Sequence, residues 1–163
     1  MASFYTDIGA IQNAPSLTNR MPAGKLTPKT FVANGRYVVT GTEVATDKIY
    51  IAKLPEGSQV IPHLSQVDSD GVGATTATLS FGDEDFTKAG VAAGSVTRYG
   101  TAADVNAAGK DLFDGATRGA ASNLAYTLQT DSWIVATFAT LTGTPTAGRV
   151  LNFRVAFNSL LNT

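Results

Sequence analysis

An all-β protein, a sandwich or barrel of antiparallel strands, is predicted by two features of the sequence. Short runs rich in β-branched and aromatic residues recur along the chain, and apolar and polar residues alternate within several of them. Clusters of Gly, Pro, Asn and Asp separate these runs at the spacing expected of a sandwich or barrel. No amphipathic helix of any length alternates with the runs, which argues against a parallel α/β sheet.

Residues 1–28 differ from the rest of the chain. Three prolines, Pro15, Pro22 and Pro28, and scattered apolar residues follow no period of 2 or 3.6. We therefore predict an extended N-terminal arm over residues 1–28 and one β-domain over residues 29–163. The apolar side chains of the arm need a partner surface, either on the chain's own sandwich or on another subunit. The predicted partner contacts are Phe4, Tyr5, Ile8, Ile11 and Leu17.

The β-domain is predicted to begin with a hairpin. Residues 31–33 and 36–39 are strand-like and flank Asn34-Gly35, the dipeptide most typical of a two-residue hairpin turn. Residues 48–54 form the next predicted strand, since they are rich in residues that favour strands. The Pro-Glu-Gly sequence at residues 55–57 ends it.

A further strand is predicted over residues 58–67, and Pro62 within it indicates a sheet edge or a bulge. Residues 68–73 are predicted to form a loop. Residues 75–81 alternate clearly, and the turn at 82–85 is predicted to end that strand. The side chains expected on its inner face are Ala77, Leu79 and Phe81.

Residues 86–122 are rich in Ala and Gly and show no clear pattern. Two interpretations stay open for this insertion: a short helix capped by Thr101, or a long loop or subunit-contact region. Strands are predicted again over 124–128, 133–140 and 149–157. In the second of these both faces are apolar, with Trp133 and Val135 on one and Ile134 and Phe138 on the other, which indicates a central strand or one covered by a partner. In the last strand the expected inner side chains are Leu151, Phe153, Val155 and Phe157.

The composition excludes several classes of function. Only 15% of the 163 residues are charged, below the usual quarter, and the net charge of -1 offers no basic surface for nucleic acid. The chain has no cysteine, which excludes disulfides and thiolate metal sites. No apolar run approaches the length of a membrane span, and the N-terminus does not read as a signal peptide, so synthesis in the cytoplasm is expected.

No catalytic or cofactor-binding residue is predicted, and we expect a protein that is not an enzyme. The single histidine, His63, is interpreted as a partly buried strand residue with a satisfied hydrogen bond. No G-x-S-x-G nucleophile motif and no glycine-rich phosphate loop occurs. Trp133 and Tyr126 are interpreted as core residues rather than a stacking platform.

Clustered carboxylates form the one candidate metal site, for calcium, at Asp68, Asp70, Asp83 and Asp85. Residues 68–79 fail the calcium-loop pattern, because Leu79 stands where the last acidic ligand belongs. We therefore predict no metal and interpret the acids as solvated turn residues or as partners of basic side chains on another surface.

Strand-turn-strand motifs recur in several segments of the chain, together with the opening arm. The segments are residues 1–5, 52–57, 60–61, 68–70, 78–83, 133–139 and 143–149. In these segments the chain resembles small structural proteins of tailed bacteriophages, of the head decoration or cement kind. Residues 86–122 contribute nothing to the resemblance.

This resemblance implies an antiparallel β-sandwich, jelly-roll-like, with an extended N-terminal arm. It implies a virion structural protein on the capsid surface, made in the host cytoplasm, that binds the major capsid protein as a homo-oligomer, a trimer or dimer, and stabilises the shell. It implies no cofactor. The alternatives are a tail or head accessory protein, and a sandwich module that binds carbohydrate or a host surface through exposed aromatics at Phe86, Tyr99 and Phe113.

Overall fold

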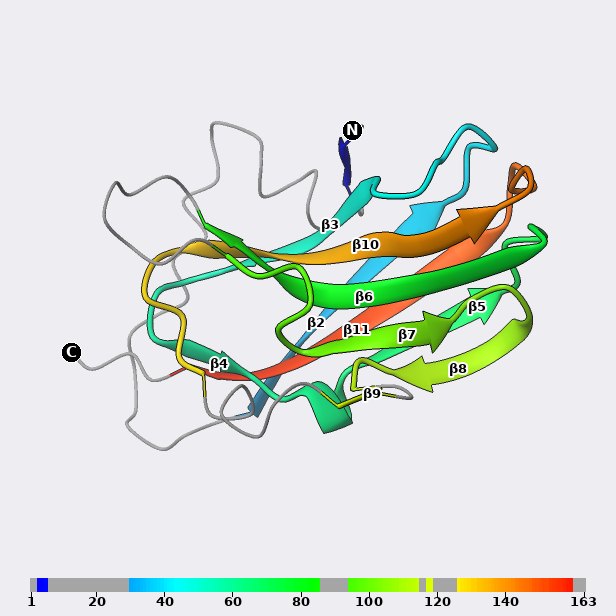
Figure 1. The fold of residues 1–163 in the computed structure, drawn as a ribbon. Helices are drawn as coiled ribbons and strands as arrows, with labels where there is room; N and C mark the ends of the chain where they lie inside the picture. Colours follow the sequence, from blue (N-terminus) through cyan, green and yellow to red (C-terminus); the bar gives the residue numbers. More distant parts are fainter. Residues whose placement is uncertain (1–2, 6–29, 86–93, 115–116, 119–125, 160–163) are drawn as a thin grey trace.

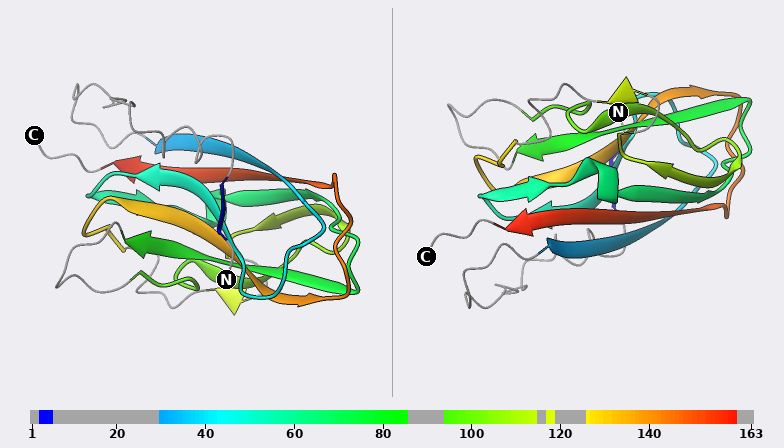
Figure 2. Two further views of the ribbon diagram at one scale, coloured as in Figure 1. Left: turned by 90° about the horizontal axis from the view of Figure 1, so that it is seen from above. Right: turned by 90° about the horizontal axis from the view of Figure 1, so that it is seen from below.

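The computed structural model describes residues 3–5, 30–85, 94–114, 117–118 and 126–159, and these residues form two β-sheets packed face to face (Figures 1 and 2). Sheet A has the order β1 (Ser3–Tyr5), β3 (Lys48–Leu54), β10 (Ser132–Thr142), β6 (Thr76–Asp85), β7 (Gly100–Asp104) and β9 (Thr117–Arg118). Sheet B has the order β2 (Thr30–Val38), β11 (Val150–Ser159), β5 (Gln66–Asp70) and β8 (Ala108–Leu112), and β4 (Ser58–Val60) pairs with the end of β11.

The strand order is that of a jelly roll. Eight longer strands divide into two sets of four, β2-β11-β5-β8 in one sheet and β3-β10-β6-β7 in the other. Neighbours pair antiparallel, except that the short β1 runs parallel to β3. The predicted all-β sandwich of jelly-roll type is confirmed. Within the described residues, no helix is long and apolar enough to cross a lipid bilayer.

The core lies between the two sheets, and strand alternation supplies it as predicted. Successive side chains of a strand point to opposite faces, so every second residue of β6 and β11 is buried. The ring of Phe81, from β6, stacks on Phe113 with the centroids 3.8 Å apart, and packs edge-on to Phe153 of β11. These contacts join the sheets across the core. The confirmed inward residues are Ala77, Leu79, Phe81, Leu151, Phe153, Val155 and Phe157.

Strand β10 is central in sheet A, between β3 and β6, and both of its faces are covered. Ile134 and Phe138 belong to the core between the sheets. On the opposite face Trp133 and Val135 form a second apolar cluster with Tyr50 of β3, whose ring meets the indole edge-on. The prediction of a central strand is confirmed.

The predicted hairpin at Asn34-Gly35 is wrong. Both residues lie inside β2, opposite Arg154 and Phe153 of β11, and neither has the positive φ that the turn requires. The ladder with β11 runs without interruption along all nine residues of β2. Pairing with a strand more than a hundred residues away therefore overrides the local turn signal.

The strand predicted over residues 58–67 is also wrong as a single element. Pro62 opens a short 3-10 helix, η1 (Pro62–Leu64), which separates β4 from β5. Proline lacks the N–H that a ladder needs and favours the first turn of a helix. His63 consequently lies on η1 with its side chain exposed, not in a strand.

Both predicted acidic turns belong to strands. Asp68 pairs with Asn152 and Lys110 on either side, and Asp83 pairs with Ile134. The neighbouring strands supply the backbone hydrogen bonds at these residues. The side chains of Asp68 and Asp83 form ion pairs with Lys110 and Arg98. The turn between β5 and β6 comes later, at residues 71–75.

Two further expectations need correction. The helix capped at Thr101 is absent, because residues 100–104 form β7 and bury Ala103 against the core. Of the strand predicted over 124–128, the described residues make only a single bridge, between Thr127 and Gln59. Leu128 is held there by backbone hydrogen bonds with Gly57 and Ser58.

Candidate functional site

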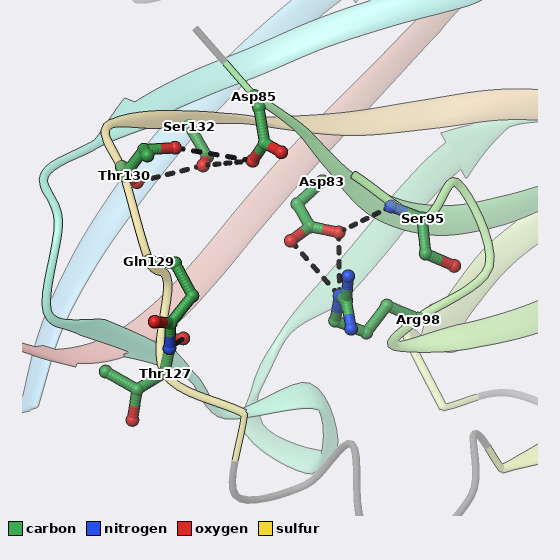
Figure 3. Close-up of polar contacts among 8 residues, drawn as sticks. All are labelled: Asp83, Asp85, Ser95, Arg98, Thr127, Gln129, Thr130 and Ser132. Atoms are coloured by element: carbon green, nitrogen blue, oxygen red, sulfur yellow. Dashed lines mark hydrogen bonds and ion pairs between the residues drawn. The ribbon is translucent and has the colours of Figure 1, made fainter. Parts of the chain in front are cut away.

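Strand β6 ends in three acidic residues, Asp83, Glu84 and Asp85, two of which are candidate calcium ligands (Figure 3). Alternation turns Asp83 and Asp85 to the same side as the core residue Phe81, and Glu84 to the outer face of sheet A. Glu84 pairs with Lys48 at 2.9 Å and accepts a hydrogen bond of 2.8 Å from the Tyr50 hydroxyl. The three neighbouring acids therefore have separate partners rather than one shared ligand.

Asp83 is engaged by the segment that leads into β7. Arg98 donates from Nε to both carboxylate oxygens of Asp83, at 2.8 and 3.1 Å, and the Ser95 N–H donates to Oδ1 at 3.0 Å (Figure 3). The Asp83 side chain is fully buried. The guanidinium also lies 3.6 Å from the ring centroid of Tyr126, a cation–π contact.

These contacts shift the protonation of the neighbouring groups. Burial by itself lowers the pKa of Arg98, but the hydrogen bond to Asp83 and the negative charge of that carboxylate outweigh it, so the pKa of Arg98 rises. Burial, with the charge of Asp83, raises the pKa of Tyr99 well above its ordinary value. The buried Asp83 carboxylate is thus held by a guanidinium and by a backbone N–H.

Asp85 has a different set of partners. The hydroxyls of Ser132 and Thr130 donate to its Oδ1 at 3.2 and 3.4 Å, and Ser132 also donates to the Thr130 carbonyl at 3.0 Å (Figure 3). These hydrogen bonds connect the end of β6 to the residues that lead into β10.

The other two candidate calcium ligands lie in the other sheet. Asp68 and Asp70 project from the outer face of β5, where Asp68 lies 3.7 Å from the Lys110 ammonium. No group of three His, Cys, Asp or Glu side chains in the described part of the chain is arranged to hold a metal ion. Two of the four acids thus lie in sheet A and two in sheet B, so they do not form one cluster. That the protein binds no calcium stays a prediction.

The predicted partner contacts of the arm fall partly within the described residues. Phe4 and Tyr5 belong to β1, whose backbone pairs in parallel with Ile49 and Tyr50 of β3. This part of the arm lies on the chain's own sheet. Ile8, Ile11 and Leu17 lie outside the described residues.

Two of the three aromatics expected on a binding loop are not exposed. Tyr99 and Phe113 are buried in the core, Phe113 through its stacking on Phe81. Phe86 lies outside the described residues. The expectation that Tyr99 and Phe113 supply a ligand platform is therefore wrong.

The sequence reasoning missed a threonine-rich tip at one end of the sandwich. We define it as the four connections at residues 39–47, 71–75, 105–107 and 143–149. Its exposed side chains are small and uncharged except for Arg149, which donates to the Asp70 carbonyl at 3.4 Å. The exposed residues are Thr40, Thr42, Val44, Ala45, Thr46, Gly73, Thr75, Ala107, Gly143, Thr144, Thr146, Ala147, Gly148 and Arg149.

Backbone hydrogen bonds hold the four connections together. Val72 donates to Val105 at 2.9 Å and accepts from Thr146 at 2.8 Å, and Gly148 donates to Val39 at 2.8 Å. Each bond joins two different connections. The tip is therefore a preorganised surface rather than a set of independent loops.

A buried carboxylate supports the tip from beneath. Glu43, 3% exposed, accepts hydrogen bonds from the Tyr37 hydroxyl, from the Thr40 N–H at 2.6 Å and from the Gly41 N–H at 2.9 Å. Burial by itself raises the pKa of Glu43, but these hydrogen bonds outweigh it, so the pKa lies below its usual value. In the sequence Glu43 stands between Thr42 and Val44, a pattern that does not predict burial.

The outer face of sheet B carries a shallow polar groove of about 330 Å³. Side chains from β2, β11 and β5 line it, and they offer amide, guanidinium and carboxylate groups. These side chains are Asn34, Arg36, Gln66, Asp68, Asn152 and Arg154. Strand alternation correctly predicted that Asn152 and Arg154 face outward. The groove itself could not be predicted, because its lining comes from three strands that are far apart in the sequence.

The described residues form a jelly-roll sandwich with a threonine-rich tip at one end and a polar groove on the outer face of sheet B. No protein-family model matches the chain, and no curated protein sequence matches it. A solved structure titled "Capsid of Ralstonia phage GP4" contains a chain of the same fold, with a TM-score of 0.66 and 15% identity, over 99% of this chain and 100% of that one. At this identity the likeness establishes the fold.

A second similar chain comes from the acidic stable capsid structure of Helicobacter pylori bacteriophage KHP30. Its TM-score is 0.49 at 16% identity, over 81% of this chain and 90% of that one. This likeness is too weak to carry an argument.

Proposed function

We propose that this chain is a structural protein of a bacteriophage virion that binds the outer surface of the capsid and stabilises the shell. The observation that carries the proposal is the fold shared with a chain of the Ralstonia phage GP4 capsid over nearly the whole of both chains. Jelly rolls also occur in lectins and enzymes, so the fold alone does not decide. The surfaces add the second line of support.

The threonine-rich tip suits docking against another protein. Ordering Gly, Ala and the stiff β-branched Thr costs little side-chain entropy compared with ordering Lys, Arg or Glu. Thirteen of the fourteen exposed tip residues are uncharged, so little charge must be desolvated on contact. The hydrogen bonds between the connections fix the surface before binding, which lowers the cost further.

The proposed partners are the major capsid protein and further copies of this chain. Each bound copy stabilises the assembled shell by mass action, since it binds the assembled state and not the separated subunits. The proposed role is not catalytic, and it places the protein on the capsid surface after synthesis in the host cytoplasm.

Binding to shells tests the proposal. Capsids of the virus that encodes the chain, prepared without it, are mixed with the purified protein and sedimented. We expect saturable co-sedimentation, and at least a tenfold loss of affinity, about 1.4 kcal/mol, in the variants Val44→Glu and Thr144→Glu. Each substitution puts a carboxylate on the tip, where docking would desolvate it.

The matched control is Thr97→Glu, an exposed position outside the tip, which keeps wild-type affinity. Failure of the wild-type protein to sediment with shells, or equal binding by all three variants, counts against docking through the tip.

A second function is favoured by the groove on sheet B. Its amides, guanidinium groups and carboxylate can hydrogen-bond sugar hydroxyls, so a carbohydrate-binding module is the alternative. Screening the chain against a glycan panel separates the two, because groove binding would be abolished by Asn152→Ala and left intact by Val44→Glu.

A further inference from the structure

Strand β2 forms an edge of sheet B. All nine of its residues pair with β11, from Thr30 opposite Asn158 to Val38 opposite Val150. Among the described residues, no strand pairs with its other side. The other edge strands of the described residues are shorter, with five residues in β8, three each in β1 and β4, and two in β9.

The direction of the backbone groups on this edge follows from one hydrogen bond. The Val39 N–H donates to the Arg149 carbonyl at 2.8 Å, toward the β11 side. In an antiparallel pair, alternate residues point their N–H and C=O groups to opposite sides. The groups that point to the open side therefore belong to Thr30, Val32, Asn34, Arg36 and Val38.

In the described part of the chain, the edge shows none of the features that keep sheet edges from pairing with other chains. Such features are proline, a bulge, an inward-pointing charge or a covering segment. β2 contains no proline, its ladder with β11 has no register shift, and its one charge, Arg36, faces outward. Val32 and Val38 are 42% and 41% exposed on the same outward face.

We propose that two copies of this chain pair through β2, antiparallel and about a two-fold axis at Asn34. Asn34 is the middle of the nine residues, so this register uses all five residues that face the open side. Each contributes an N–H and a C=O, which gives about ten backbone hydrogen bonds between the copies. The product is one continuous eight-stranded sheet, two copies of β2-β11-β5-β8.

The side chains are self-complementary in this register. Val32 lies opposite Arg36 of the second copy, so the aliphatic stem of the arginine covers the exposed valine. Thr30 lies opposite Val38, and Asn34 opposite Asn34, which can hydrogen-bond as an amide pair. No like charges face each other, because β2 carries a single charge. The interface is isologous and closes at two copies.

This pairing gives the proposed homo-oligomer a structure. The dimer itself is argued from the β2 edge alone, and only its role on a capsid rests on the proposed function. The β2 edge and the threonine-rich tip share no residue. Because the two β2 strands run antiparallel, the tips of a dimer lie at opposite ends of the pair, so each tip stays free to dock on its own surface.

Sedimentation equilibrium of the full chain tests the pairing in solution. We expect a mass of twice the chain at micromolar concentration, and a monomer for Asn34→Pro. Proline removes an N–H on the open side and leaves the bonds to β11, a position that edge strands accept. Asn34→Thr keeps the N–H and stays dimeric.

Cross-linking fixes the register and does not depend on the proline variant folding. The natural chain has no cysteine, so Asn34→Cys places one thiol on the two-fold axis. Opposed hydrogen-bonded residues lie about 5.5 Å apart between Cα atoms, inside the disulfide range. We expect a covalent dimer on mild oxidation. Thr30→Cys is the control and does not cross-link, because the two thiols lie eight residues apart along the strand, about 27 Å.

A wild-type chain that stays monomeric up to its solubility limit overturns the pairing, as does a dimer in which Thr30→Cys cross-links and Asn34→Cys does not. Shell binding by Asn34→Pro separates the two proposals. A monomeric Asn34→Pro that still binds shells upholds both. A wild-type dimer that binds no shell upholds the pairing and removes the proposed function.

Discussion

Arg98 donates hydrogen bonds from Nε to both carboxylate oxygens of the buried Asp83, at 2.8 and 3.1 Å. Its guanidinium also lies over the ring of Tyr126. One side chain thus joins β6, the segment before β7 and the segment before β10. Asp83, a candidate calcium ligand in the sequence, thus takes part in a contact between three segments of the sandwich.

Removing the cation is expected to destabilise the fold strongly. Arg98→Met leaves the fully buried Asp83 without its charge partner, and breaking such a pair costs about 3–5 kcal/mol. The free energy of unfolding, measured by urea titration, should fall by that amount. The control is Lys110→Met, which breaks an exposed pair with Asp68 at 3.7 Å and should cost less than about 1 kcal/mol. Equal losses in the two variants would contradict the role given to Arg98.

A methyl group at Gly82 should displace the same segment. A Cβ at this position would lie 1.8 Å from the Ser95 carbonyl oxygen, which belongs to the backbone and cannot move alone. We expect Gly82→Ala to lower the free energy of unfolding by about 2 kcal/mol or more.

The matched control for this variant is Gly109→Ala, in β8. A Cβ there meets nothing within 4 Å and the backbone φ is not positive, so alanine should be neutral or stabilising by about 0.4–1 kcal/mol. If Gly82→Ala were as stable as Gly109→Ala, the segment would not pack on β6 as described.

Glu43 predicts a dependence of stability on pH. Its pKa is lowered in the folded protein, so its contribution is fully present above the unfolded pKa of about 4.3 and is lost as the pH falls through the folded pKa. Urea titrations at a series of pH values from neutral to acid should show the wild type losing more stability than Glu43→Gln. The difference between the two should shrink toward acid pH, and a difference that stays constant would exclude this linkage.

Calcium should leave the melting temperature unchanged. Asp83 is already paired with Arg98, and Asp68 and Asp70 lie in the other sheet. A calcium titration followed by thermal melting checks this. A rise in melting temperature that is absent in Asp85→Asn would show a metal site at the end of β6.

Strand alternation is a good guide to the parts of this fold that are decided by burial. The strand at 48–54 has the predicted bounds, and the inward residues of β6 and β11 are those the period of two selects. The apolar residues on both faces of β10 correctly indicated a strand that is covered on both sides: Trp133 and Val135 on one face, Ile134 and Phe138 on the other.

The sequence misleads where distant pairing outweighs a local signal. Asn34-Gly35 favours a turn by itself, but β11 supplies a continuous ladder that keeps it extended. The Asp83–Arg98 pair joins residues fifteen positions apart across a segment with no period, so no pattern announces it. The threonine-rich tip likewise exists only because the jelly roll brings four connections to one end.

The copy number of the chain in purified virions tests the central claim most directly. Quantitative mass spectrometry would compare this chain with the major capsid protein in the same particles. A protein that decorates the capsid lattice should be present in a fixed ratio of the same order as the major capsid protein. Absence from the particles would contradict a virion role, and a few copies per particle would indicate a tail or head accessory protein instead.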